Sequence, residues 1–139
     1  MLRLLEKPSG HHSILVTDSD ATIRQQLMAA LEPEGFSVYE AAGGREAVEL
    51  ARKRIVDILI LNMMLPDSDG VNTLRLIRQL VEPLPCIFIG NRVSKEMRMQ
   101  ALTAEAFAVL EGPFQPVLLT RTVWKLVHRY FGPPIRPMG

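Results

Sequence analysis

The 139 residues of this chain suit one domain with a buried core, and 47% hydrophobic with 22% charged residues exclude a disordered protein. The formal net charge of +1 gives no sign of binding to nucleic acid or lipid, and no apolar run reaches the roughly 18 residues of a membrane span. The single cysteine, Cys86, excludes an internal disulfide, and with no signal peptide at the start we expect a cytoplasmic protein.

Five apolar runs alternate along the chain with segments of helical periodicity. The expected strands are residues 14–17, 36–40, 55–61, 86–89 and 106–110. The expected helices carry apolar positions at 23–31 and 47–51 and span 71–80, 94–103 and 116–131. Residues 1–12 are expected to be a flexible leader, 13–131 the domain, and the Pro-rich residues 132–139 a tail or the start of a linker.

A strand followed by a helix, five times over, predicts an α/β fold: a doubly wound five-stranded parallel sheet with helices on both faces. Right-handed crossovers make the strand order 2-1-3-4-5 one of its two common forms. Functional sites in such folds lie beyond the carboxyl ends of the strands, near strands 1 and 3. We therefore expect Asp18, Ser19 and Asp20 to lie beside Asn62, with Gly90 and Gly112 flanking them.

The segments "ILVTDSDATIRQQL", "DILILNMMLPDSDG", "PCIFIGN" and "AFAVLEGPF" resemble the receiver domain of two-component response regulators. The resemblance covers about residues 13–131 and implies a flavodoxin-like fold. In that family a kinase phosphohistidine donates its phosphoryl group to an aspartate at the end of strand 3. An acidic pair after strand 1 helps to hold Mg²⁺, a Thr or Ser ends strand 4, and a Lys precedes a Pro after strand 5.

At the metal and acceptor positions the chain departs from this pattern. Asp18 stands at the first acid, but Ser19 replaces the second, and Asn62 replaces the phosphoacceptor. The backbone carbonyl of Met64 corresponds to the family's third metal ligand. An amide cannot accept a phosphoryl group as a carboxylate does, and Mg²⁺ prefers charged oxygen ligands. We therefore expect no resident metal, apart from the alternative of a weak residual cation site at Asp18.

The positions that bind phosphoryl oxygens in the family have also changed. Gly90 replaces the Thr or Ser, Gly112 replaces the Lys before Pro113, and Val109 replaces the aromatic residue of strand 5 that usually reports phosphorylation. We therefore predict an atypical pseudo-receiver without enzyme activity or cofactor, which acts in bacterial signal transduction through phosphorylation-independent protein–protein contact. Two alternatives stay open: phosphorelay chemistry at a surrogate aspartate, and sensing of a small molecule in the vacated pocket.

The last helix carries basic residues at i, i+4 and i+8, which form one stripe. A solvated face is the simplest interpretation of such a stripe. The resemblance adds that the face made by the fourth helix, fifth strand and fifth helix is a usual docking and dimerisation surface. We expect it to bind an acidic protein or a second copy of the chain, and expect no binding of nucleic acid or membrane. The candidate residues are Lys95, Arg98, Val109, Arg121, Lys125 and Arg129.

Overall fold

The computed structural model describes residues 12–81 and 84–132. All but one residue of the predicted leader, and all but one of the predicted tail, lie outside these ranges. Five parallel strands form one sheet in the order β2-β1-β3-β4-β5, as predicted. The strands are β1 (Ser13–Thr17), β2 (Ser37–Ala41), β3 (Ile58–Asn62), β4 (Cys86–Gly90) and β5 (Ala108–Glu111).

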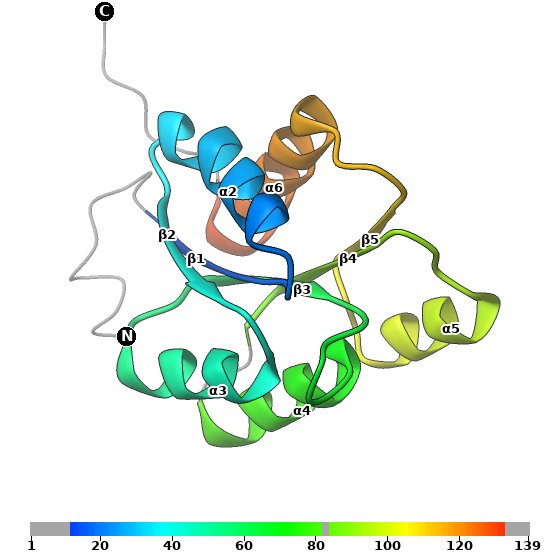
Figure 1. Ribbon diagram of the computed structural model, residues 1–139. Coiled ribbons are helices and arrows are strands. Elements are labelled where there is room, and N and C mark those ends of the chain that lie inside the picture. The colour runs from blue at the N-terminus through cyan, green and yellow to red at the C-terminus, as the bar shows by residue number, and fades with distance from the viewer. Residues whose placement is uncertain (1–11, 82–83, 133–139) are drawn as a thin grey trace, which may run out of the picture.

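Helices cover both faces of the sheet (Figure 1). On one face lie α2 (Ala21–Leu31), which continues into the short 3-10 helix η1 (Glu32–Glu34), and α6 (Pro116–Phe131). On the other face lie α3 (Gly44–Lys53), α4 (Gly70–Leu80) and α5 (Lys95–Thr103). None of the helices in the described ranges is long and apolar enough to cross a membrane.

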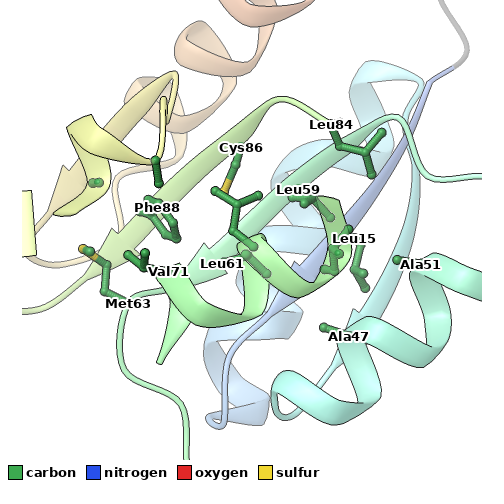
Figure 2. Close-up of a cluster of buried hydrophobic side chains, with 14 of the residues drawn as sticks. Leu15, Ala47, Ala51, Leu59, Leu61, Met63, Val71, Leu84, Cys86 and Phe88 are labelled. Atoms are coloured by element: carbon green, nitrogen blue, oxygen red, sulfur yellow. The ribbon is translucent and has the colours of Figure 1, made fainter. Parts of the chain in front are cut away.

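The sheet separates two hydrophobic cores, because successive side chains of a strand point to opposite faces. In β1, Leu15 packs with the cluster under α3 and α4, whereas Ile14 and Val16 pack with the cluster under α2 and α6. Figure 2 shows the first cluster, in which Phe88 and Cys86 of β4 lie among residues of the neighbouring strands and helices. Burial on both faces explains why the strands are continuous apolar runs and not alternating patterns.

Every predicted strand differs from the observed strand by one to three residues at one or both ends. The third strand begins at Ile58 and not at residue 55, because Ile55 is 39% exposed and the Asp57 carboxylate accepts a hydrogen bond from the Ser13 backbone N–H (2.9 Å). The fifth strand is Ala108–Glu111 and not 106–110. The third, fourth and fifth strands each extend one residue further than predicted. The last residues of these strands therefore lie at the carboxyl end of the sheet, where the site is.

Candidate functional site

Asp18 and Asn62 lie at the carboxyl ends of two neighbouring strands. Thr17 of β1 is paired in register with Leu61 of β3, so the residues that follow each of them meet at one edge of the sheet. The helices after β1 and β3 cover opposite faces of the sheet (Figure 1), and ligands commonly bind at such a point in folds of this kind. Asp18 is nevertheless only 4% exposed, so its carboxylate needs partners.

The Asn62 side-chain amide bridges Asp18 and the start of the following loop. Its Nδ2 donates to Asp18 Oδ2 (2.8 Å), and its Oδ1 accepts from the Met64 backbone N–H (2.8 Å). A backbone N–H can only donate, so the Met64 contact fixes which end of the amide faces Asp18. Asn62 thus supplies a donor to a buried carboxylate where an aspartate would supply a second negative charge.

Asp18 has a full set of partners besides Asn62. Its Oδ1 accepts from the Asp20 backbone N–H (2.9 Å), and its carbonyl oxygen accepts from Arg24 (2.7 Å). Asp20 is exposed and caps α2, since its side chain accepts from the Thr22 N–H (2.8 Å). Asp18 is therefore a buried member of a hydrogen-bond network, and Asp20 is the helix cap.

A cavity of about 320 Å³ opens beside this network. Asp18, Ser19, Asn62, Gly90 and Gly112 all line it, so the structure brings together every predicted pocket residue except Met64. Met64 is absent from the lining, and its side chain is 71% exposed.

The two glycines leave the cavity open. A Cβ atom at Gly112 would meet nothing within 4 Å, and one at Gly90 would meet only Val93 Cγ2 at 3.3 Å. Gly112 also has a φ of 97°, in the left-handed region that favours glycine. A lysine at this position would need a different backbone or would be strained by about 1 kcal/mol.

The donor set at this site does not fit the Mg²⁺ ion that the resemblance implies. Asp18 contributes the only carboxylate of the predicted pocket set, and both of its oxygens accept hydrogen bonds. Ser19 offers a neutral hydroxyl, and Asn62 turns its NH₂ group, not an oxygen, toward Asp18. A unit charge pair at 4 Å is worth about 4 kcal/mol at an effective dielectric of about 20, so each missing carboxylate is costly for a divalent ion. No group of three metal-ligating side chains occurs within the described ranges.

Glu111 is a site residue that the sequence prediction missed. It ends β5 just before Gly112, where its Oε2 accepts from the Val93 N–H (3.0 Å) and its Oε1 pairs with Arg98 of α5 (2.5 Å). The backbone hydrogen bond from Val93, and then Arg98, hold the pKa of the Glu111 carboxyl below its usual value. Glu111 therefore connects the β4–α5 loop, through Val93, and α5, through Arg98, to the edge strand β5. A lone acidic residue at a strand end was the sole sequence signal.

Asp67 has a comparable role on the other side of the site. Its Oδ1 and Oδ2 accept from the backbone N–H groups of Gly44 (2.8 Å) and Arg45 (3.0 Å), which begin α3. These hydrogen bonds, with that from Arg45 the larger cause, lower the pKa of Asp67. The α3 N-cap, Gly43, has no side chain of its own, so a residue 23 positions from Gly44 supplies the cap. Nothing in the local sequence predicts this contact.

The basic residues of the candidate interaction face are all exposed, whereas Val109 of β5 is half-buried against the core. Arg98 is paired with Glu111, but Lys95, Arg121, Lys125 and Arg129 have no ion-pair partner among the described residues. Met99 and Leu102 are exposed apolar residues of α5, the helix that also carries Lys95 and Arg98. The structure thus shows the basic residues of the candidate face to be exposed, and it leaves open to a partner the four that have no ion pair within the described ranges.

Comparisons with known proteins agree with this geometry. Residues 14–123 match the family model described as the response regulator receiver domain. The chain is 36% identical over 101 residues to the response regulator MprA of Mycolicibacterium vanbaalenii, which covers 73% of this chain and 44% of that protein. It is 30% identical over 118 residues to the transcriptional regulatory protein SrrA of Staphylococcus aureus, which covers 85% of this chain and 48% of that protein. The chain thus spans about half the length of these relatives.

Solved structures show the same fold. The chemotaxis protein CheY4 of Vibrio cholerae superposes with a TM-score of 0.77 at 26% identity, over 83% of this chain and 98% of that one. A CheY-like receiver domain from Methanospirillum hungatei superposes with a TM-score of 0.80 at 24% identity, over 85% of this chain and 94% of that one. At this identity the likeness is evidence for the fold only. From the matched family model and these relatives, the chain belongs to the response regulator receiver domains of two-component systems.

Proposed function

We propose that this receiver domain acts without phosphotransfer, through protein–protein contact in cytoplasmic bacterial signalling, and that it has no enzyme activity and no resident cofactor. The observation that supports this most strongly is the bridge that Asn62 makes between Asp18 and the Met64 backbone N–H. The bridge satisfies a buried carboxylate internally, without a cation. A receiver built in this way is held in one state.

Three further features favour the same function. The amide of Asn62 cannot form an acyl phosphate. Gly90 and Gly112 have no side chains with which to bind phosphoryl oxygens. Glu111 pairs with Arg98 and fastens α5 to β5 independently of any phosphoryl group.

Intact-mass measurement after incubation with acetyl phosphate and Mg²⁺ tests the absence of phosphotransfer, with an ordinary receiver domain as the positive control. We expect no gain of one phosphoryl group, and binding of the partner that does not change with the phosphodonor. An acid-stable, base-labile phosphoprotein would contradict the proposal.

Chemistry at a surrogate aspartate has less support. Asp57 precedes β3 and bonds to the Ser13 N–H at the amino end of β1, the opposite edge of the sheet from Asn62. Asp67 caps α3, and Asp69 caps α4 by accepting from the Asn72 N–H (2.7 Å). Each of these carboxylates already has a structural role. Tandem mass spectrometry of any phosphorylated product would identify such an acceptor.

For the partner we propose an acidic protein surface that binds the basic face of α5, β5 and α6. Exposed charges of one sign steer association with a surface of the opposite sign. Replacing Arg121, Lys125 and Arg129 together by glutamate should abolish capture of the partner from the native host. The matched control replaces three exposed basic residues of α3, namely Arg45, Arg52 and Lys53, by glutamate.

A homodimer through the same face is the second candidate, because Met99 and Leu102 offer exposed apolar surface beside the charges. Light scattering across a concentration series distinguishes the two. A dimer that the α6 triple variant dissociates, and that the α3 variant leaves intact, would favour self-association.

A further inference from the structure

We propose that the cavity beside Asn62 is a binding site for a small organic cation, in which an ammonium or guanidinium group is joined to an apolar body. The proposal depends on the shape and lining of the cavity, not on whether phosphotransfer is absent. It goes beyond protein contact because it assigns a ligand class to the site.

The cavity has an apolar wall that extends away from the strand ends. Ile23 and Leu27 of α2, Leu110 of β5, and Phe114 and Leu118 near the start of α6 form it. Ile23, Leu27, Leu110 and Phe114 belong to the hydrophobic cluster under α2 and α6, so the cavity extends from the carboxyl ends of the strands toward these two helices. At about 320 Å³ its volume lies at the lower end of the range of small-molecule sites. A cavity of this volume fits a small molecule and not a folded segment of a protein.

The opposite end of the cavity is acidic. Asp18, Asp20 and Glu111 line it, and no lysine, arginine or histidine is among the lining residues. Glu111 is balanced by Arg98, and the nearby Arg24 is paired with Glu40 (2.7 Å). Asp18 and Asp20 have no ion-pair partner among the described residues, which leaves two negative charges at this end.

Asp18 and Asp20 also differ in how many of their carboxylate oxygens accept hydrogen bonds. The oxygens of Asp18 accept from Asp20 N–H and Asn62 Nδ2, whereas Asp20 uses Oδ1 for its cap and its Oδ2 accepts no hydrogen bond within the described ranges. Asp20 Oδ2 is thus open to a donor on a ligand. The Ser19 hydroxyl lines the same end and adds a neutral acceptor. Anions, including phosphates, are disfavoured by the same charges.

The two ends together select an amphipathic cation over its neutral and anionic relatives. Gly90 and Gly112 line the cavity without contributing a side chain to it. The apolar wall supplies contact area, and the acidic end supplies orientation and charge selectivity.

The test compares three probes of matched size: 2-phenylethylamine, 2-phenylethanol and 3-phenylpropionate. Dissociation constants are measured by titration of the ¹⁵N-labelled full chain, with the Asn62 side-chain NH₂ signals as the local reporter. We expect the amine to bind about tenfold more tightly than the alcohol and the carboxylate to bind most weakly, as one additional charge pair predicts. Equal affinities, a preference for the carboxylate, or no saturable shift with any probe at 10 mM would overturn the proposal.

Two variants separate the two ends of the site. Asp20→Asn keeps a capping side chain, so α2 is preserved, and should remove the preference for the amine without changing the affinity for the alcohol. Leu118→Gln on the half-exposed apolar wall should weaken the amine and the alcohol by the same factor. The control, Leu80→Gln on the exposed surface of α4, should change neither.

Two other outcomes count against the site. If Asp20→Asn leaves the preference for the amine intact, Asp20 does not supply the charge selectivity, and the proposed contact of the ligand with Asp20 Oδ2 is wrong. If Mg²⁺ alone shifts the Asn62 signals and none of the probes does, the acidic end is an ion site without an organic ligand.

Discussion

Replacing Asn62 by aspartate tests the bridge directly. The Nδ2–Oδ2 contact of 2.8 Å to Asp18 becomes a contact between two carboxylate oxygens, and Asp18 is 4% exposed. Two unit charges at that separation repel by about 6 kcal/mol at an effective dielectric of about 20. Loss of a hydrogen bond to a charged group adds about 1.5–3 kcal/mol.

Side-chain rotation and proton uptake relieve most of this energy, so we expect a net loss of about 2–4 kcal/mol in unfolding free energy at pH 7. For a domain of this size that corresponds to a fall in Tm of about 8–16 °C. The assay is thermal and urea unfolding in EDTA, with Asn62→Ala as the matched control. Alanine removes the same hydrogen bonds without adding a charge, so Asn62→Ala should lower the unfolding free energy by about half as much as Asn62→Asp.

The pH dependence of Asn62→Asp distinguishes repulsion from loss of packing. Like charges raise the pKa of one carboxyl of the pair in the folded state. A folded pKa above the unfolded one makes the destabilisation complete at high pH and removes it as the pH falls toward about 4. The difference in stability from wild type should therefore shrink in acid by more for Asn62→Asp than for Asn62→Ala. An aspartate variant as stable as wild type at pH 7, or one that gains a phosphoryl group from acetyl phosphate, would refute the reasoning.

Three further predictions concern groups outside the bridge. Asp67→Asn should lower the Tm at pH 7, and by less as the pH falls below 3.8. Because the folded pKa is depressed, the contribution of the carboxylate is present above the usual value of 3.8 and is lost as the pH falls through the folded value; Ser68→Ala is the control. Glu111→Gln should speed amide hydrogen exchange of the β4–α5 loop, above all at Val93, without affecting exchange in α3. The Cys86 thiol, whose pKa burial raises, should not react with a disulfide reagent until the protein unfolds, and rapid labelling of the native protein would contradict its burial.

The fold could be predicted from the sequence because strand burial and helix periodicity are local signals. Buried parallel strands require continuous apolar runs, and the last helix was predicted at its observed bounds, Pro116–Phe131. Strand ends were less accurate, since Asn62 and Glu111 extend β3 and β5 through pairing with the neighbouring β4, which no local pattern encodes.

The site could be predicted only in part. Its location follows from the strand order, so Asp18 and Asn62 were placed together correctly. The partners of Asn62 were not predicted, because the direction of an amide depends on which backbone groups face it. The contacts of Asp67 with α3 and of Glu111 with Val93 join residues 22–23 and 18 positions apart, and their chemistry is invisible until the chain is folded.

The departures at this site are coupled, so reversing them one at a time should not restore a working receiver. An aspartate at position 62 would repel the Asp18 carboxylate, because Ser19 contributes no charge to bind a cation between them. A lysine at position 112 meets a backbone with φ of 97° and a neighbouring Glu111 already paired with Arg98. Each reversion is thus unfavourable while the other positions keep the residues they have in this chain. Double-mutant cycles between Asn62→Asp and Ser19→Asp in excess Mg²⁺ should give a favourable coupling energy, whereas the two changes should add independently in EDTA or couple unfavourably.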